Sequence, residues 1–228
     1  MKTKTVKILG IIAVLLLSGL LFVGEEAPQK EPEKELPLPA EVNLDIPFII
    51  QAPFNDWSYP FNHTCEEAAV LMVNYYLEGQ TSVDQAQIKQ ELLDIVEYQT
   101  KNYGFHEDTS AAQTAKLISD YYGYAAEVKY GISSEDIKKE LARGNPVIVP
   151  AAGRLLNNQY FKPPGPLYHM LVIKGYNADG FITNDGGTRM GADLIYSYQV
   201  IENAIHDLEG DLLSIDSGRP AMIAVKKF

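Results

Sequence analysis

The sequence predicts an α+β domain with N-terminal helices packed on a mostly antiparallel sheet. Segments with helical periodicity occupy residues 65–122, and apolar strand-like segments dominate after Gly123. Helices that precede strands, rather than alternating with them, are typical of the α+β class. The chain has 228 residues, of which 46% are hydrophobic and 21% are charged, so wholesale disorder is excluded.

The first 24 residues have the layout of a signal anchor or signal peptide. Lys2, Lys4 and Lys7 precede an uncharged run, residues 8–24, that is rich in Leu, Ile and Val. The expected cleavage positions lack the required small residues, which favours an uncleaved transmembrane anchor. We therefore expect a single-pass membrane protein with its domain outside the cytoplasm, or a secreted protein if the signal is removed.

Residues 25–40 form a linker rich in proline and glutamate, and the rest of the chain, residues 41–228, forms one domain. Lysines and glutamates balance within residues 1–40, so the whole net charge of −11 belongs to the domain. Such an excess of negative charge repels phosphate backbones and argues against nucleic-acid binding.

The helical half begins after a strand-like stretch, 42–51, and a polar loop, 52–63. Thr64 and Glu67 have the spacing of a capping box, which predicts a helix that starts at Cys65. Gly79 ends this helix. A second helix is expected from Ser82, with Gln85 completing its box, to Thr100, and a third from 110 to 122, with Gly123 as its stop.

The second half supplies the sheet, and we expect the helices to cover one of its sides. The predicted strands are residues 125–130, 146–150, 169–176, 181–185, 194–198 and 221–226. Short helices are expected at 134–143 and before Ile205. A turn at 177–180 joins two of the strands into a hairpin, and loops occupy 153–166 and 186–192.

The single cysteine is the first candidate for chemistry. Cys65 is expected at a helix start, where the helix dipole favours a thiolate, but a buried packing residue is an equally good interpretation. Adjacent carboxylates raise the pKa of a thiol. We expect Glu67 to be engaged in capping and Glu66 to face solvent. With one thiol and no closely spaced histidines, a metal site is not expected.

His169 is the best candidate among four histidines for the base that a thiol nucleophile needs. It begins an apolar strand, whereas His63 lies in a loop and His106 and His206 are expected to be solvated. Asp185 ends the next strand of the hairpin, where its carboxylate could orient the imidazole. A structural histidine and an ordinary Asp-Gly turn remain the alternatives.

The order of these residues resembles the peptidase C39-like family, which has the papain-like cysteine peptidase fold. The resemblance rests on IPFIIQAPFNDW, TCEEAAVLMVNYYLEG, YHMLVIKGYN and FITNDGGTRMGADLIYSY, spread over residues 46–198. It differs in having Glu66-Glu67 where many relatives have Gly-Pro after the cysteine, and in a longer spacing from Gln51 to Cys65 than in papain.

The resemblance implies a thiol protease, a hydrolase of peptide bonds that needs no cofactor and takes a peptide or protein as its partner. It implies Cys65 as the nucleophile, His169 as general base and acid, Asp185 as the residue that orients it, and Gln51 as the oxyanion donor. The loops at 52–63, 153–166 and 186–192 are expected to line the cleft, with Trp57, Tyr160 and Phe161 as candidate substrate contacts.

Two other functions remain open at this point. One is a non-catalytic peptide-binding module on the same fold. The other is a related thiol amidase that acts on cell-wall peptides and shares the site. Neither the substrate nor the oligomeric state follows from the sequence.

Overall fold

The computed structural model describes residues 37–82 and 84–227. The predicted signal segment and most of the predicted linker, residues 25–36, lie outside the described residues. In the part that is described, no helix combines the length and the apolar composition needed to cross a membrane.

An antiparallel sheet forms the centre of the folded unit, and all its described strand pairs are antiparallel. Its strands lie in the order β2-β7-β3-β4-β5-β6, with β1 beside β4. Their bounds are β1 Val42–Asn43, β2 Ala125–Tyr130, β3 Val147–Ala152, β4 Tyr168–Tyr176, β5 Phe181–Asn184, β6 Leu194–Tyr196 and β7 Ala221–Lys226.

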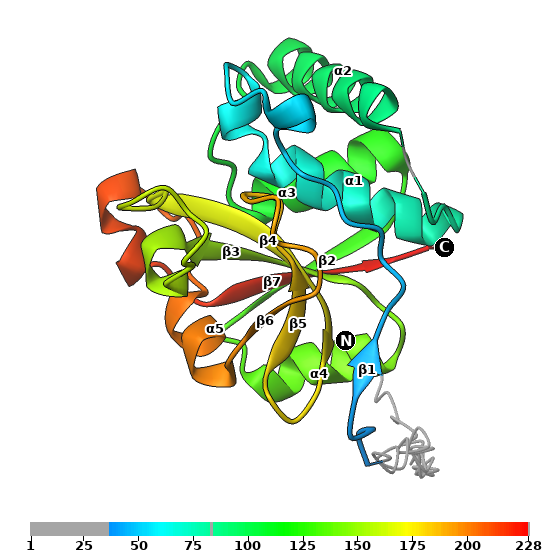
Figure 1. Cartoon of the computed structure of the whole chain (residues 1–228), viewed down its shortest axis with the longest axis vertical. Helices are drawn as coiled ribbons and strands as arrows, with labels where there is room; N and C mark the ends of the chain where they lie inside the picture. Colours follow the sequence, from blue (N-terminus) through cyan, green and yellow to red (C-terminus); the bar gives the residue numbers. More distant parts are fainter. Residues whose placement is uncertain (1–36, 83, 228) are drawn as a thin grey trace, which may run out of the picture. The chain divides into compact units, whose positions relative to one another are not determined.

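Helices cover both faces of this sheet (Figure 1). The α-helices are α1 Cys65–Glu78, α2 Gln85–Tyr103, α3 Ala111–Leu117, α4 Ser134–Ala142 and α5 Tyr198–Ala204. The first three pack on one face, whereas α4 and α5 pack on the other, so the expectation that all helices lie on one side is wrong. The reason is visible in β4, where alternate side chains enter opposite cores: Met170 and Val172 enter one core, and Leu171 and Ile173 the other.

The start of α1 differs from the prediction, although the helix itself is confirmed. Thr64 precedes Cys65, but its hydroxyl donates to the carbonyl oxygens of Gln51 and Phe61 instead of capping the helix. Glu67 is fully buried and accepts the side-chain amide of Gln99 instead of completing a capping box. The predicted end is confirmed, because Gly79 has a φ of 73° and closes the helix in the left-handed conformation.

The Ser82 box is also wrong, because α2 starts at Gln85 and the side chain of Gln85 accepts the backbone N–H of Phe54. The first predicted strand is shorter than expected, since only Val42–Asn43 pairs with β4. Elsewhere the predicted sheet is confirmed: β2 and β7 have the expected bounds, and a turn from Asn177 to Gly180 joins β4 to β5.

Candidate active site

The folded unit contains a cavity of about 790 Å³ that brings together three of the predicted residues, Gln51, Cys65 and His169. The fourth, Asp185, lies behind His169 and is fully buried. These residues come from the segment before α1, the first turn of α1, the start of β4 and the position directly after β5. The antiparallel pairing of β4 with β5 places the two strand ends side by side, as the hairpin predicted.

His169 is held through one ring nitrogen. Its Nε2 lies 2.7 Å from Oδ1 of Asp185, and only 2% of the residue is exposed. An imidazole N–H that donates to a carboxylate fixes the tautomer of the ring and leaves Nδ1 for the cavity side. Phe161 packs edge-on against the ring, with centroids 5.4 Å apart.

Asp185 is anchored by further donors that sequence reasoning missed. Its Oδ2 accepts the Tyr196 hydroxyl at 2.7 Å and the Asn158 amide at 3.0 Å, while Oδ1 also accepts the Gly187 N–H at 3.0 Å. Although burial opposes ionisation, the charge and hydrogen bond of His169 and these donors hold the pKa of Asp185 below its ordinary value. The site therefore favours a carboxylate beside the imidazole.

Cys65 occupies the first position of α1 and is 7% exposed. Its sulfur lies 3.0 Å from Oε2 of Glu66. Burial and then the negative charge of an ionised Glu66 raise the pKa of the thiol well above its ordinary value, and the Met170 backbone has an opposite, smaller effect. Met170 directly follows His169 on β4, so this effect comes from the strand that carries the imidazole.

Glu66 and Glu67 do not lie where the sequence suggested. Both carboxyls are fully buried. Glu66 accepts the backbone N–H of Thr109 at 2.7 Å, and Glu67 accepts the side-chain amide of Gln99. The loop that leads to α3 therefore closes over the first turn of α1, a contact that local sequence patterns do not reveal.

His106 is buried rather than solvated, because it belongs to this same loop and only 3% of it is exposed. Its Nδ1 lies 3.6 Å from Oε1 of Glu67, and its Nε2 lies 3.0 Å from the Tyr59 hydroxyl. The nearby Glu67 carboxyl raises the pKa of His106. His206 is half-buried and contacts the Gly218 carbonyl, away from the cavity residues.

Gln51 lies at the cavity and is tied to the loop after β5. Its backbone N–H donates to Gly186, and its side-chain Nε2 donates to the Phe61 carbonyl at 3.0 Å. An amide NH₂ group has two hydrogens, so one remains for another acceptor. All three predicted loops contribute to the lining, with Trp57, Tyr160 and Phe161 among the lining residues, and so do Asp108 and Leu212, which the sequence did not suggest.

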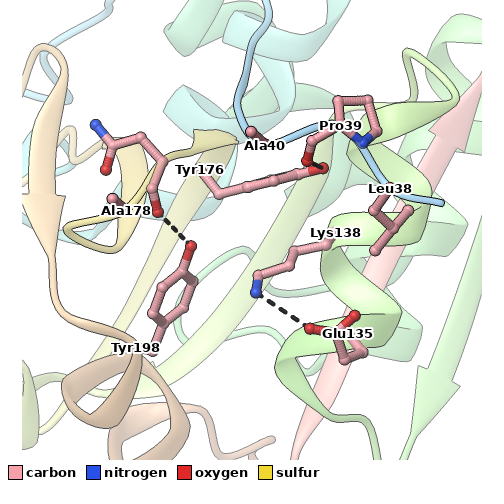
Figure 2. A pocket seen from close by; sticks show the side chains of 9 residues that line it. Leu38, Pro39, Ala40, Glu135, Lys138, Tyr176, Ala178 and Tyr198 are labelled. Carbon is pink, nitrogen blue, oxygen red and sulfur yellow. Dashed lines mark hydrogen bonds and ion pairs between the residues drawn. The ribbon is translucent and has the colours of Figure 1, made fainter.

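A smaller cavity of about 310 Å³ lies between α4 and the end of β4 (Figure 2). Lys138 forms an ion pair with Glu135 there, and Tyr198 donates to the carbonyl of Asn177. No cysteine or histidine is among its described lining residues, so it offers no nucleophile and base. The described ranges also hold no cluster of three or more His, Cys, Asp or Glu suited to a metal ion.

Comparison with known proteins agrees with this fold and gives the family. A model of the peptidase C39-like family matches residues 43–207, and the chain therefore belongs to that family. It is similar to a crystal structure from Bacillus anthracis assigned as a C39-like peptidase, with 16% identity, a TM-score of 0.52, and 82% of this chain and 98% of that chain covered.

A second solved structure is xylellain, a cysteine protease from Xylella fastidiosa, with 14% identity and a TM-score of 0.39 over 84% of this chain and 87% of that chain. No curated protein matches the sequence. The family and the fold are those predicted, namely the peptidase C39-like family and a fold of helices packed on an antiparallel sheet.

Proposed function

We propose that the chain is a cysteine peptidase that hydrolyses peptide bonds with Cys65, His169 and Asp185 as its triad. The observation that carries the proposal is the 2.7 Å contact of His169 with a buried Asp185, at a cavity that Cys65 also lines. An oriented base beside a thiol is the arrangement that acyl transfer requires.

The reaction follows from the roles of these groups. The Cys65 thiol gives its proton to Nδ1 of His169, and the sulfur attacks the substrate carbonyl. The backbone N–H of Cys65 and the remaining side-chain hydrogen of Gln51 stabilise the oxyanion. His169 then protonates the leaving amine, and water hydrolyses the thioester. Asp185 stabilises the imidazolium that forms in both steps.

Digestion of a peptide mixture by the purified full-length chain tests this proposal. New peptide termini, detected by mass spectrometry, should appear with the wild type and with the control variant His206→Asn. They should be absent with Cys65→Ala and His169→Asn. Equal cleavage by wild type and Cys65→Ala would refute the peptidase assignment.

A peptide-binding module without turnover is the second candidate, and the raised pKa of the buried thiol favours it. This function predicts that wild type and Cys65→Ala retain the same peptides from the mixture and generate no new termini. Release of amide-linked fragments from cell-wall peptides, but not from protein peptides, would instead indicate the thiol amidase.

We further propose that the chain is exported and attached to the membrane by residues 8–24, on the strength of their composition and the preceding lysines. Fractionation of cells that express the full-length chain tests this. The protein should stay with carbonate-washed membranes and be degraded by protease added to intact cells. Recovery in the cytoplasm would contradict export.

A further inference from the structure

A buried carboxyl touches the sulfur that the proposed mechanism uses, and the mechanism gives it no role. Oε2 of Glu66 lies 3.0 Å from Sγ of Cys65, within hydrogen-bond distance for sulfur. Glu66 is fully buried, and its Oε1 is fixed by the backbone N–H of Thr109 at 2.7 Å. The carboxyl is therefore held in place against the sulfur.

The surroundings determine which form this carboxyl takes. The titratable groups that interact with it are Cys65 and Glu67 on α1 and Tyr168 on β4. In the loop before α3, His106 interacts with Glu67 and Asp108 with Tyr168. Glu67, not Glu66, lies 3.6 Å from the His106 ring. Glu66 receives only uncharged donors, namely the Cys65 thiol and the backbone N–H groups of Thr109 and of Glu66 itself. Two adjacent buried carboxylates cannot both ionise cheaply.

Glu67 is thus the better place for the negative charge, and Glu66 for the proton. The pKa of Glu66 agrees with this assignment, because burial and then Glu67 raise it well above its ordinary value. A neutral carboxylic acid is a hydrogen-bond donor as well as an acceptor.

We propose that Glu66 is a further catalytic residue, which in its protonated form donates a hydrogen bond from Oε2 to the thiolate of Cys65. The proton that leaves Cys65 goes to Nδ1 of His169, and the proton on Glu66 stays on Glu66 throughout. Cys65 and Glu66 then titrate as a pair. This inference rests on the proposed function, because it gives the sulfur the role of nucleophile.

The pair has a measurable signature, since the chain contains one cysteine and alkylation therefore reports on Cys65 alone. In the wild type, the iodoacetamide rate should rise with pH in two steps separated by a plateau, because the second ionisation of the pair occurs at higher pH. In Glu66→Gln the carboxyl is gone while a donor and the acceptor for Thr109 remain, so the rate should rise in one step.

Glu66→Leu is the matched variant, neutral and similar in size but without a donor. Its thiolate should form about one pH unit higher than in Glu66→Gln, which makes alkylation near pH 6 about tenfold slower. Circular dichroism and thermal unfolding of the full-length chains establish that each variant is folded. If Glu66→Leu does not fold, the number of steps in the alkylation profiles of wild type and Glu66→Gln tests the proposal without it.

A single step in the wild type that superimposes on that of Glu66→Gln would overturn the proposal, as would identical profiles for folded Glu66→Gln and Glu66→Leu. Peptide hydrolysis by the same preparations separates this inference from the proposed function. A two-step profile without any peptide cleavage refutes the peptidase but keeps the Cys65–Glu66 pair. Peptide cleavage together with a one-step alkylation profile would support the peptidase and refute the Cys65–Glu66 pair.

Discussion

The Asp185 carboxylate has four donors around its two oxygens, and only one of them is His169. The other three donors fix the position of the carboxylate, and the carboxylate in turn orients the ring of His169. Such supporting hydrogen bonds keep a reactive group within the small range of angles that the reaction requires.

Replacing Asp185 with Asn should therefore lower kcat/KM for a cleaved peptide by roughly 10²- to 10⁴-fold. The amide keeps the shape of the side chain but cannot stabilise the imidazolium, and it can present a donor to Nε2 and so favour the other tautomer. Steady-state kinetics measure the loss. Activity within a factor of two of wild type would show that Asp185 does not orient the base.

Tyr196→Phe should have a smaller effect, because Asp185 keeps its other donors. Loss of one hydrogen bond to a charged group costs about 1.5–3 kcal/mol, which should appear mainly as reduced stability to urea. If Tyr196 supports Asp185, the pKa of Asp185 should be slightly higher in the variant than in wild type. As the pH is lowered, the variant should then lose activity at a higher pH than wild type does. An unchanged pH profile would limit Tyr196 to a structural role.

Among individual residues, the sequence predicted the positions of those that lie at the ends of helices and strands. Cys65 begins α1, His169 lies at the start of β4 and Asp185 follows β5. The apolar strand patterns located the two strand residues, whereas the helix start at Cys65 was predicted from a capping box that the structure lacks. The sequence did not predict the burial of Glu66 or the role of Asn158, because both depend on contacts with loops from distant parts of the chain. Those contacts join Glu66 to Thr109 and Asn158 to Asp185.

The loop after β5 shows how an element positions the site. Gly187 follows Asp185 by two residues and packs on the His169 ring, where a Cβ would lie 2.8 Å from Cε1. It would also lie 2.9 Å from the Phe161 ring. The missing side chain is thus what lets this loop approach the imidazole so closely.

Gly187→Ala should displace the imidazole and lower kcat/KM by roughly 10²-fold, since misplacement by about 1 Å has that effect on a positioned group. Gly210→Ala is the control, because a Cβ there meets nothing within 4 Å. Kinetics of both variants, with their melting temperatures, separate displacement from unfolding. Equal activity of the two variants would show that the loop does not position His169.

The strands could be predicted better than the helix starts. The apolar run of residues 169–176 predicted the strand β4, but the expectation of helices on one side overlooked that every residue of β4 is buried. Burial on both faces is what places helices on both sides of the sheet. The capping patterns at Thr64 and Ser82 failed, because the side chains of Thr64, Glu67 and Gln85 have tertiary partners that compete with capping. At α3, by contrast, Ser110 and Gln113 form a capping box.

For the whole molecule, the buried carboxyls couple stability to pH. The pKa of Glu66 is raised in the folded state, so between its ordinary value near 4.5 and the raised value the folded chain binds more protons than the unfolded chain. Stability from this group should therefore fall as pH rises through that window. Burial raises the pKa of Glu67 as well, with partial compensation by His106.

Glu66→Gln removes the titration of Glu66, so the stability of the variant should fall less steeply with rising pH than that of wild type. Urea unfolding of the full-length wild type and variant from pH 5 to pH 8 measures it. The stability of the variant relative to wild type should increase with pH. A difference that stays constant over this range would show that Glu66 has the same pKa in both states.

The proposed peptidase activity depends most on a reactive Cys65 sulfur that His169 activates. The rate at which iodoacetamide alkylates native full-length chain, measured against pH, tests this directly because Cys65 is the one cysteine in the sequence. Burial raises the pKa of the thiol, but transfer of its proton to His169 leaves a thiolate beside an imidazolium. We therefore predict reaction well below pH 8, at least tenfold slower in His169→Ala. A sulfur that reacts only after denaturation, or equally fast in both chains, would contradict the account.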